Sequence, residues 1–340
     1  MKQLPQEDLQ FIDDKLSFIS QKLNNKHIFI TGATGFIGSW LLESLIYIAK
    51  QKNINLSISI LTRNKNNFLN NYPHLQNSLF NILEGDIRSL EVNAIDRNID
   101  YIIHAATDAK LNHENPLLVA DTIVQGTRNV LEICRQHKIT KLLFLSSGAV
   151  YGKDSPELSG FGENSPLSPD CNNSVSSYGE AKRYAELLCS IYHKQFQIPY
   201  VTARCFSFVG PRLPINSHFA IGNFIKNIIC NEDIEISGDG KDIRSYLYIA
   251  DLVVWLFNIL INAKPATVYN VGSNNNYTIE QIAQMVIKST KSTRKYKILN
   301  QNINSSAYIP NINKALEELN VAVFHNIEES IIKTKNWYSQ

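Results

Sequence analysis

A tyrosine and a lysine four residues apart form the clearest chemistry-bearing pair in the sequence. Tyr178 and Lys182 lie within residues 176–195, whose pattern predicts a helix, so both side chains fall on one helix face. A tyrosine with a pKa of about 10 is a poor base at neutral pH, and a neighbouring cation favours the phenolate and lowers that pKa. Tyr-x-x-x-Lys is common by chance. The pair gains weight from two independent motifs, a glycine-rich turn and Ser146-Ser147 at the end of a predicted strand.

The glycine-rich turn is Gly32-x-x-Gly35-x-x-Gly38, between a predicted strand at residues 27–30 and a predicted helix at residues 39–49. Glycines permit a tight turn, a close backbone approach to a pyrophosphate and close packing of the helix on the strand. The helix N-terminus offers free N–H groups and the positive end of its dipole to the phosphates. The alternative is a chance turn, but the strand before and the helix after it favour a dinucleotide site.

The end of the second predicted strand, residues 57–61, bears on which dinucleotide binds. An NAD site usually has an acid there for the ribose 2′-OH, but Thr62 and Arg63 follow this strand, with no acid close behind. Arg63 could pair with a 2′-phosphate, which slightly favours NADP over NAD. The alternative for Arg63 is a solvated loop arginine.

The elements that must position these residues alternate between strands and helices. Further strands are predicted at residues 101–104, 141–145 and 200–204, with a helix at 123–136. This alternation predicts an α/β fold, a Rossmann-type doubly wound parallel sheet. After residue 210 it loosens into helices at 221–230, 251–262 and 279–289 and strands at 234–236 and 269–271, which we assign to a smaller, largely C-terminal lobe.

Three divisions of the chain follow from this pattern. Residues 1–25 are an N-terminal helical extension, whose apolar residues Leu9, Ile12, Leu16, Ile19 and Leu23 have helical spacing. Residues 26–210 are the dinucleotide-binding domain with the helix of Tyr178 and Lys182, and residues 211–340 form mainly the substrate lobe. Residues 152–174, rich in Ser, Pro, Asn and Gly, are expected to be a long loop.

Composition excludes several function classes. The 340 residues include 33 Lys and Arg against 31 Asp and Glu, a net charge of +2, so there is no excess of cations for nucleic acid or an acidic membrane. The five cysteines form no CxxC pair, which is typical of reduced thiols in a cytosolic protein. The first residues do not resemble a signal peptide, and the longest apolar stretch, 246–261, is too short to span a bilayer. We expect a soluble cytoplasmic protein without a metal site.

Together these motifs make the chain similar to the extended short-chain dehydrogenase/reductase family, in its nucleotide-sugar epimerase and dehydratase branch. The resemblance runs from about residue 25 to about residue 319. It is carried by TGATGFIG at 31–38, GDIR at 85–88, HAAT at 104–107, SSGAVYG at 146–152, YGEAK at 178–182, ARCFSFVGP at 203–211, GDGKDIRSYLYIADL at 238–252 and YNVGS at 269–273.

The resemblance implies a Rossmann domain for NAD or NADP and a small lobe for a nucleoside-diphosphate sugar. The implied cofactor-binding residues are Gly32, Thr34, Gly35, Phe36, Ile37, Gly38, Arg63, Asp86, Ile87, Ala105, Ala106, Thr107, Tyr178 and Lys182. Tyr178 would exchange a proton with a sugar hydroxyl as hydride moves between a sugar carbon and the nicotinamide. Lys182 would tune Tyr178 and hold the nicotinamide ribose, and Ser147 would hydrogen-bond the reacting oxygen.

Substrate contacts are implied for Arg244, Ser147, Ser207, Arg212 and Asn270. Arg244 has the family's diphosphate position, where a guanidinium suits bidentate binding. Its alternative is a surface salt bridge with Asp242 or Asp251. Arg212 and Asn270 are weaker candidates, and His104 is interpreted as a packed core histidine rather than a base.

Four departures from the family pattern narrow the function. The usual Asn of RxFNxxGP is Ser207, and Ile123 replaces an Asn of the dimer helix. Ser306-Ala307-Tyr308 stands where many relatives carry an Arg for the nucleotide, which leaves the base open. Dehydratases have Asp-Glu after the catalytic Thr, and here those positions are Gly148 and Ala149. Glu163 in the long loop is a carboxylate that could reach in instead.

The sequence therefore predicts a nucleotide-sugar epimerase or 4-ketoreductase. A 4,6-dehydratase is the alternative among enzymes, and a catalytically idle NAD(P)-binding sensor is the alternative from another class. Such sensors typically lose the Tyr or the Lys, and both are present here. The resemblance also implies a homodimer, in which helices 123–136 and 176–195 pair across a two-fold axis.

Overall fold

Strands with apolar runs come together in one large parallel sheet. The computed structural model describes residues 1–76, 80–91, 95, 98–107, 114–152, 160–217, 219–300 and 306–339. Within them a seven-stranded sheet has the order β11-β6-β5-β4-β1-β2-β3. Its strands are β1 (Lys26–Thr31), β2 (Leu56–Thr62), β3 (Asn81–Glu84), β4 (Tyr101–His104), β5 (Lys141–Ser147), β6 (Tyr200–Cys205) and β11 (Thr267–Val271), all paired in parallel. The predicted doubly wound α/β fold is confirmed.

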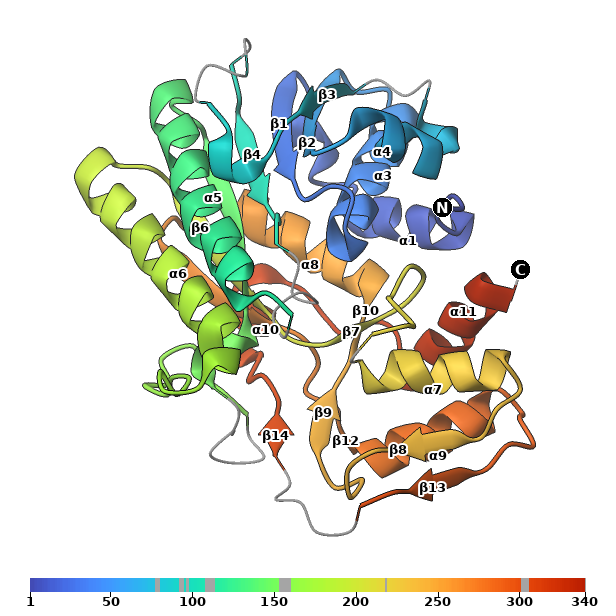
Figure 1. The fold of residues 1–340 in the computed structure, drawn as a ribbon. Helices are drawn as coiled ribbons and strands as arrows, with labels where there is room; N and C mark the ends of the chain where they lie inside the picture. The colour runs from blue at the N-terminus through green and yellow to red at the C-terminus, as the bar shows by residue number, and fades with distance from the viewer. Residues whose placement is uncertain are drawn as a thin grey trace.

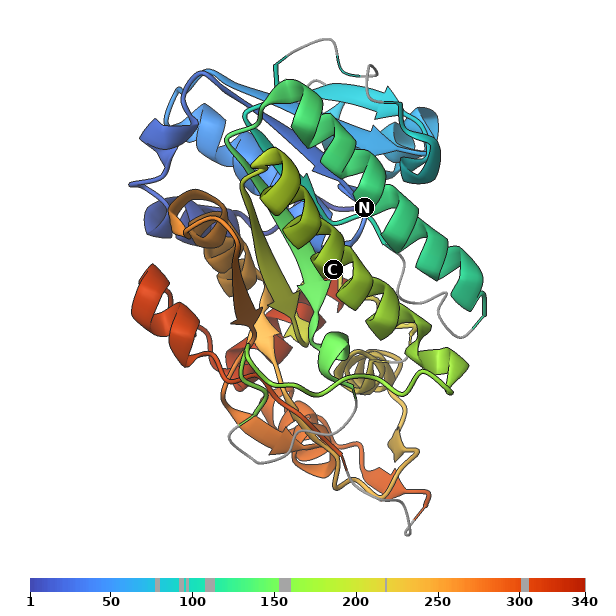
Figure 2. The ribbon, with the colours of Figure 1, turned by 90° about the vertical axis from the view of Figure 1, so that its left-hand side faces the viewer.

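Helices cover both faces of this sheet, which is why its strands are apolar on both sides. Helices α3 (Phe36–Gln51) and α8 (Ile249–Asn262) cover one face, and α5 (Pro116–His137) and α6 (Ser177–Phe196) lie side by side over the other (Figures 1 and 2). Successive residues of a strand point to opposite faces. Leu143 of β5 accordingly packs with the cluster of α3 and α8, whereas Leu142 and Phe144 pack with that of α5 and α6.

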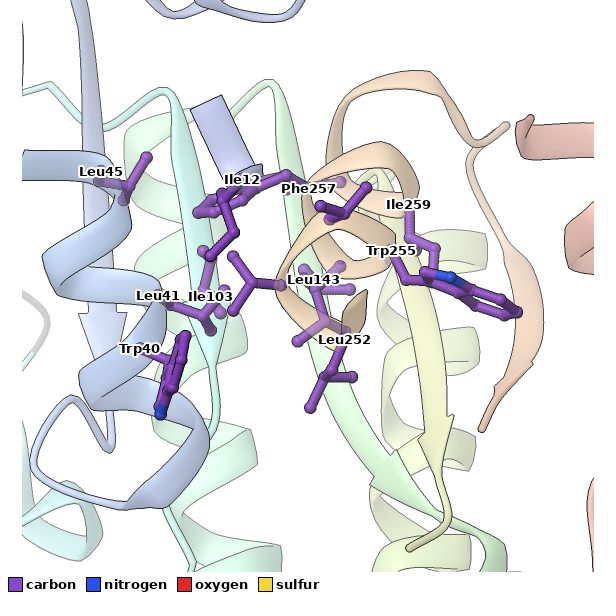
Figure 3. Packing of buried hydrophobic residues seen from close by; sticks show 14 of the residues in the cluster. Ile12, Trp40, Leu41, Leu45, Ile103, Leu143, Leu252, Trp255, Phe257 and Ile259 are labelled. Carbon is purple, nitrogen blue, oxygen red and sulfur yellow. The ribbon is translucent and has the colours of Figure 1, made fainter. Parts of the chain in front are cut away.

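The core beneath α3 and α8 joins segments that are far apart in the sequence. Figure 3 shows Trp40 and Leu41 of α3 facing Leu252 of α8 across the sheet residues Ile103 and Leu143. Ile12 of α1 (Gln6–Lys15) completes this layer. Because α8 closes the core, the fold of the first half depends on residues beyond 249.

The N-terminal segment packs as predicted but is not one continuous helix. It forms α1 and the short α2 (Ser20–Leu23), separated by a turn in which the Ile19 N–H donates to the Leu16 carbonyl. All five predicted apolar residues, from Leu9 to Leu23, are at most 2% exposed. The buried Asp8 carboxylate accepts a hydrogen bond from the Tyr248 hydroxyl at 2.7 Å, which ties α1 to the start of α8.

The smaller lobe has its own apolar core between three helices. These are α7 (Ala220–Ile229), α9 (Ile279–Ser289) and α11 (Ile327–Ser339). Short strands accompany them: β8 (Ile234–Ile236) with β13 (Tyr296–Ile298), β9 (Ile243–Ser245) between β12 (Asn276–Thr278) and β14 (Ala307–Tyr308), and β7 (Phe208–Val209) with β10 (Leu247–Tyr248). The lobe lies below the large sheet in Figure 1.

Two elements assigned from sequence to the smaller lobe belong instead to the large layer, which is the seven-stranded sheet with the helices that cover it. Strand β11 pairs with β6 as the last strand of the sheet, and α8 packs on β5 and β6. Helix α10 (Asn313–Leu319) then packs on β11. The prediction was wrong here because chain order alone does not reveal that the polypeptide returns to the sheet after residue 248.

Other segments differ in smaller ways. The stretch between β2 and β4, for which no element was predicted, contains α4 (Lys65–Asn71) and strand β3. Of the predicted loop at 152–174, residues 153–159 lie outside the described part of the chain, and Phe161 bridges to Pro310. No helix in the described residues combines the length and apolarity needed to cross a membrane.

Candidate active site

One cavity of about 780 Å³ lies at the carboxyl ends of β1, β2, β4 and β5. This is where strand order reverses between β1 and β4, the usual ligand position in an open parallel sheet. Nearly all predicted site residues line it: Gly32, Thr34, Gly35, Phe36, Ile37, Gly38, Arg63, Asp86, Ile87, Ala105, Ala106, Thr107, Ser147, Tyr178, Lys182, Ser207 and Arg212. Arg244 and Asn270 are the two that do not.

The glycine turn brings the N-terminus of α3 to the cavity. Gly32 has a φ of +74°, and a Cβ there would lie 2.6 Å from the Ala105 carbonyl. A Cβ on Gly38 would lie 2.1 Å from the Gly32 oxygen. A side chain at Gly38 would therefore push α3 away from the turn, and one at Gly32 would clash with the backbone that follows β4. The first N–H groups of a helix have no partner within it, so this turn fits a dinucleotide pyrophosphate.

The far end of the cavity carries charged groups of both signs. Asp86 begins the 3₁₀ turn η2 (Ile87–Ser89), and its carboxylate accepts hydrogen bonds from the Arg88 N–H at 2.9 Å and from the guanidinium Nη2 at 2.8 Å. Hydrogen bonding to Arg88 lowers the pKa of Asp86 to about 2, and the charge of Arg63 adds a smaller effect. Arg63 itself is exposed at the end of β2. This end therefore fits an adenosine with an anion near its ribose.

His104 is a packed core residue, as predicted. Its Nδ1 lies 2.7 Å from the Thr31 hydroxyl and its Nε2 lies 3.1 Å from the Thr127 hydroxyl. Burial, with a smaller effect of the Lys182 charge, lowers the pKa of His104 to about 3. A neutral imidazole with both nitrogens engaged holds the ends of β1 and β4 together, and Ala105 continues from it into the cavity wall.

Ser147, Tyr178 and Lys182 meet where β5 ends against the first turns of α6. The Ser147 hydroxyl accepts a hydrogen bond from the Ala149 N–H at 3.1 Å. The Lys182 ammonium donates to the Leu145 carbonyl at 2.7 Å and lies 5.0 Å from the Phe144 ring centre. Burial lowers the pKa of Lys182 to about 8. The structure thus brings Ser147, Tyr178 and Lys182, the trio singled out from the sequence, together in the cavity wall.

Lys182 does not lower the pKa of Tyr178 in the protein without a bound dinucleotide, contrary to expectation. The pKa of Tyr178 is raised to about 12, because burial outweighs the opposing effect of its hydrogen bond with Ser147. The Lys182 ammonium is committed to the Leu145 carbonyl, and Tyr178 is therefore a protonated phenol at neutral pH.

A second phenol, which the sequence analysis did not assign to the site, belongs to Tyr308 on β14. It lines the cavity, hydrogen-bonds with Ser147 and packs against Phe206 with ring centres 4.8 Å apart. A Cβ on Gly148 would lie 2.5 Å from its hydroxyl, so the absence of a side chain at 148 makes room for it. Burial raises the pKa of Tyr308. Its only sequence signal was its position in the Ser306-Ala307-Tyr308 departure.

Of the substrate candidates in the cavity wall, Ser207 lines the cavity, and Arg212 is partly paired with other residues, with its Nε and Nη1 atoms buried without a hydrogen-bond partner. The Ser207 carbonyl accepts the Leu247 N–H at 3.0 Å, and its side chain lines the cavity. The buried Arg212 guanidinium donates to Glu43 Oε1 at 2.5 Å and to the Lys2 carbonyl at 2.6 Å. Arg212 thus links the cavity wall to the N-terminal segment.

Arg244 and Asn270 make protein contacts outside the cavity. Arg244 donates to Asp242 at 3.1 Å and to the Ser306 carbonyl at 3.1 Å, which is the salt bridge considered as its alternative. It is nevertheless the direct strand neighbour of Tyr308. The Asn270 side chain is fully buried and bonded to Tyr151 and to two backbone carbonyls, so it is a structural contact rather than a cavity residue.

Carboxylates are scarce in the described part of the cavity wall around the trio. Asp86, at the opposite end and paired with Arg88, is the single carboxylate lining the cavity within the described ranges. Glu163, considered above as a carboxylate that reaches in, instead accepts the Asn270 N–H at 2.9 Å. An acid–base pair for removing water from a sugar is thus not found among these residues.

Comparison with known proteins identifies one enzyme family and similar nucleotide-sugar epimerases. Residues 28–272 match the model of the NAD dependent epimerase/dehydratase family. An uncharacterized UDP-glucose epimerase of Bacillus subtilis (strain 168) is 29% identical over 283 residues, which cover 78% of this chain and 83% of that protein.

Solved structures share the whole fold. The UDP-glucuronic acid 4-epimerase of Bacillus cereus, solved with UDP-glucuronic acid and NAD, is 25% identical with a TM-score of 0.78 over 92% of this chain and 98% of that chain. The UDP-N-acetylglucosamine 4-epimerase of Methanobrevibacter ruminantium M1 has a TM-score of 0.81 at 24% identity, over 93% of this chain and 98% of that chain. The second similarity concerns the fold alone.

Proposed function

The chain belongs to the NAD dependent epimerase/dehydratase family, an enzyme family, and on that premise we propose that it is a nucleotide-sugar epimerase or 4-ketoreductase. The observation that carries the proposal is the shared cavity. It joins the glycine turn, at Gly32 and Gly38, to Ser147, Tyr178 and Lys182. A dinucleotide bound along the turn and a sugar bound beside Tyr178 would share one enclosed space, as hydride transfer requires.

The trio supplies the proton chemistry. When bound, the dinucleotide supplies the donor or acceptor of the hydride. Tyr178 exchanges a proton with the oxygen on the reacting carbon, because its hydroxyl carries a transferable proton and lies at the cavity beside Ser147. Ser147 holds that oxygen by a hydrogen bond. Lys182, which donates to the Leu145 carbonyl in the protein alone, would hold the nicotinamide ribose of the bound dinucleotide.

The scarcity of carboxylates supports epimerase or reductase chemistry over dehydration. Elimination of water across C5 and C6 of a hexose needs a base for the C5 proton and an acid for the leaving hydroxyl. Gly148 and Ala149 cannot exchange protons, and Tyr308 occupies the space above Gly148. The 4,6-dehydratase is therefore the second candidate, and the presence of both Tyr178 and Lys182 speaks against an idle sensor.

The dinucleotide is NAD or NADP, and Arg63 supports NADP. Its guanidinium lines the cavity where β2 ends, and the nearby Asp86 carboxylate is already paired with Arg88. A 2′-phosphate would gain a cationic partner there, whereas a 2′-hydroxyl would meet, among the described residues of the cavity wall, only the Asp86 carboxylate that is already paired. Against this, the similar Bacillus cereus epimerase was solved with NAD.

The substrate is proposed to be a nucleoside-diphosphate sugar, in line with the UDP-glucuronic acid bound by the similar Bacillus cereus epimerase. Its sugar lies beside Tyr178 and Ser207 in the part of the cavity near the smaller lobe. Arg244 binds the diphosphate if its guanidinium exchanges Asp242 for the ligand, which its place beside Tyr308 would permit. The large layer then serves mainly the dinucleotide, and the smaller lobe mainly the nucleotide sugar.

A homodimer through α5 and α6 is part of the same proposal. Tyr184, Leu187 and Ile191 form an apolar stripe on α6 that is 36–52% exposed, and Leu117 on α5 is 78% exposed. Residues three and four apart share one helix face, so the stripe is continuous. Exposed apolar helix faces of this kind are suited to packing against a second copy.

The experiment that tests the function is a substrate panel. Purified protein is incubated with UDP-, dTDP-, GDP- and CDP-sugars, with and without NAD or NADP, and products are analysed by mass spectrometry and NMR. An epimerase gives a product of unchanged mass with one inverted carbon, and a ketoreductase adds two hydrogens to a 4-keto sugar. A product lighter by one water would establish the dehydratase instead.

A further inference from the structure

A partly buried glutamate one turn beyond Lys182 connects the two elements that carry the catalytic trio. Glu186 lies on α6, and its side chain is 13% exposed. Its Oε1 accepts a hydrogen bond from the hydroxyl of Ser146 at 2.5 Å. Ser146 directly precedes Ser147 at the end of β5. The carboxylate therefore fixes the end of β5 against α6 at the point where Ser147 meets Tyr178.

Arg204 of β6 completes this arrangement. Its Nε donates to Glu186 Oε1 at 3.0 Å and its Nη2 donates to Oε2 at 2.7 Å, which is a bidentate ion pair. Its remaining Nη1 donates to the Tyr151 hydroxyl at 2.7 Å and to the Glu163 carbonyl at 2.9 Å. Three adjacent elements, β5, β6 and α6, are thus held by one carboxylate and one guanidinium.

The contacts continue to the segment that carries Tyr308. The Tyr151 hydroxyl donates to Asn270 Oδ1 at 2.9 Å, and the Asn270 amide donates to the Phe161 and Asn311 carbonyls at 2.7 and 3.1 Å. Asn311 follows β14 by three residues. The network therefore ends on the segment that aims Tyr308 at Ser147, and this explains why Asn270 is buried away from the cavity.

Glu186 is also the anion that faces Lys182. Besides Glu186 and the protonated Tyr178, the titratable groups facing the ammonium, within the described residues, are His104 on β4, Cys205 on β6 and Cys189 on α6. Burial lowers the pKa of His104 to about 3 and raises the pKa of Cys205 to about 12 and that of Cys189 further, so all three are neutral near pH 7. The charge of Glu186 raises the pKa of Lys182 against the effect of burial.

We propose that Glu186 is a positioning residue of the active site, which fixes Ser147 against Tyr178 through Ser146 and supplies the negative charge that keeps Lys182 an ammonium. The inference rests on the proposed function for the roles of Ser147, Tyr178 and Lys182. A purely structural ion pair would stabilise the fold without affecting the protonation of Lys182, and a buried ion pair is by itself weak support for stability.

The test compares Glu186→Gln with Glu180→Gln. Both remove one carboxylate from α6, but Glu180 is more exposed and its neighbour is Arg183 at 3.9 Å. The titration of Lys182 is followed by NMR in protein labelled with ¹³C-lysine, with Lys182→Arg to assign the signal. We expect Glu186→Gln to lower the pKa of Lys182 by about one unit and Glu180→Gln to leave it unchanged. An unchanged Lys182 titration in folded Glu186→Gln overturns the proposal.

Turnover on a substrate from the panel gives the second readout. The alkaline fall of kcat in Glu186→Gln moves to lower pH with the Lys182 titration, because the ammonium is lost sooner. If the NMR titration moves but the wild type turns over no nucleotide sugar, the proposed function fails while the electrostatic role of Glu186 stands. The two failures are therefore distinguishable.

Two further variants cover the case in which Glu186→Gln does not fold, since it leaves Arg204 without a full partner. Ser146→Ala removes the contact with Glu186 but keeps the charge, and Glu186→Asp keeps the charge on a shorter side chain. We expect each to lower kcat about tenfold, as for the loss of one hydrogen bond to a charged group, with KM and the Lys182 titration near wild type. Wild-type kcat in Ser146→Ala overturns the positioning role.

Discussion

At the scale of single residues, the protonation state of Tyr178 decides whether ketone reduction or alcohol oxidation is easier to start. With a pKa of about 12, its phenol holds its proton at neutral pH and is ready to donate it to a carbonyl oxygen, as ketone reduction needs. Oxidation of a sugar alcohol needs the phenolate, and therefore additional positive charge beside Tyr178. Lys182 is an ammonium below its pKa of about 8, but it donates to the Leu145 carbonyl and leaves Tyr178 protonated in the protein alone.

Replacing Tyr178 with Phe removes the transferable proton and keeps the ring. We expect kcat to fall by ~10²–10⁴-fold, the usual size of an acid–base contribution. Nucleotide-sugar affinity, measured by calorimetry, stays near wild type because the cavity keeps its shape. Turnover close to that of the wild type would show that another group moves the proton.

Replacing Gly148 with Ala tests whether Tyr308 is fixed above it. The added methyl group would lie 2.5 Å from the Tyr308 hydroxyl and 2.7 Å from the Phe206 ring. We expect a loss of about 1–3 kcal/mol in the free energy of unfolding, as for other overpacked sites. In a Tyr308→Phe background the loss should shrink, because one of the two contacts is gone.

The control for this cycle is Gly162→Ala, since a Cβ there meets no atom within 4 Å. Denaturant unfolding of the four proteins of the cycle gives the coupling. If Gly148→Ala lowers the free energy of unfolding equally in both backgrounds, the position of the Tyr308 hydroxyl does not depend on the small residue at 148.

At the scale of elements, apolar runs and turn residues carried most of the prediction. Most strands of the large sheet before residue 205 were recognisable because burial on both faces makes their sequences rich in apolar residues, whereas the short and half-exposed β3 was not. The glycine turn was recognisable because its backbone geometry restricts residue type at Gly32 and Gly38.

The parts that escaped prediction depend on contacts between distant segments. Tyr308 reaches Ser147 through the two-residue strand β14, which is too short to have a pattern of its own. The salt bridge of Arg244 with Asp242, and the network that buries Asn270, are likewise set by pairing across the fold. Motifs therefore located the dinucleotide end of the cavity better than its sugar end.

Arg63 belongs to this scale because its role follows from where β2 ends. The Arg63→Asp substitution removes the cation that would pair with a 2′-phosphate. It introduces a carboxylate that can accept a hydrogen bond from a 2′-hydroxyl. We expect the ratio of NADP to NAD affinity, measured by titration, to fall by at least about tenfold, the effect of one charge-assisted hydrogen bond. A wild type that already binds NAD far more tightly than NADP would contradict the role assigned to Arg63.

At the scale of the whole molecule, the cavity depends on both layers and on the N-terminal segment. The large layer contributes the strand ends, and the smaller lobe contributes Tyr308 through β14. The N-terminal segment is joined to both. The Lys2 carbonyl accepts a hydrogen bond from Arg212 beside the cavity, and the Asp8 carboxylate pairs with Lys333 of α11 at 2.9 Å. Substitutions far from Tyr178 can therefore alter the cavity by shifting one layer against the other.

The last prediction concerns assembly through the exposed face of α6. Leu187 is 52% exposed in the middle of the apolar stripe with Tyr184 and Ile191, and α6 carries Tyr178 and Lys182 at its other end. A charge at the centre of a packed helix face leaves an unpaired ion in an apolar contact. We therefore expect Leu187→Glu to convert a dimer into monomers in sedimentation velocity, whereas Leu299→Glu, which alters a residue 50% exposed on the smaller lobe, leaves the dimer intact. A wild type that sediments as a monomer, or a Leu187→Glu variant that remains dimeric, would contradict the proposed interface.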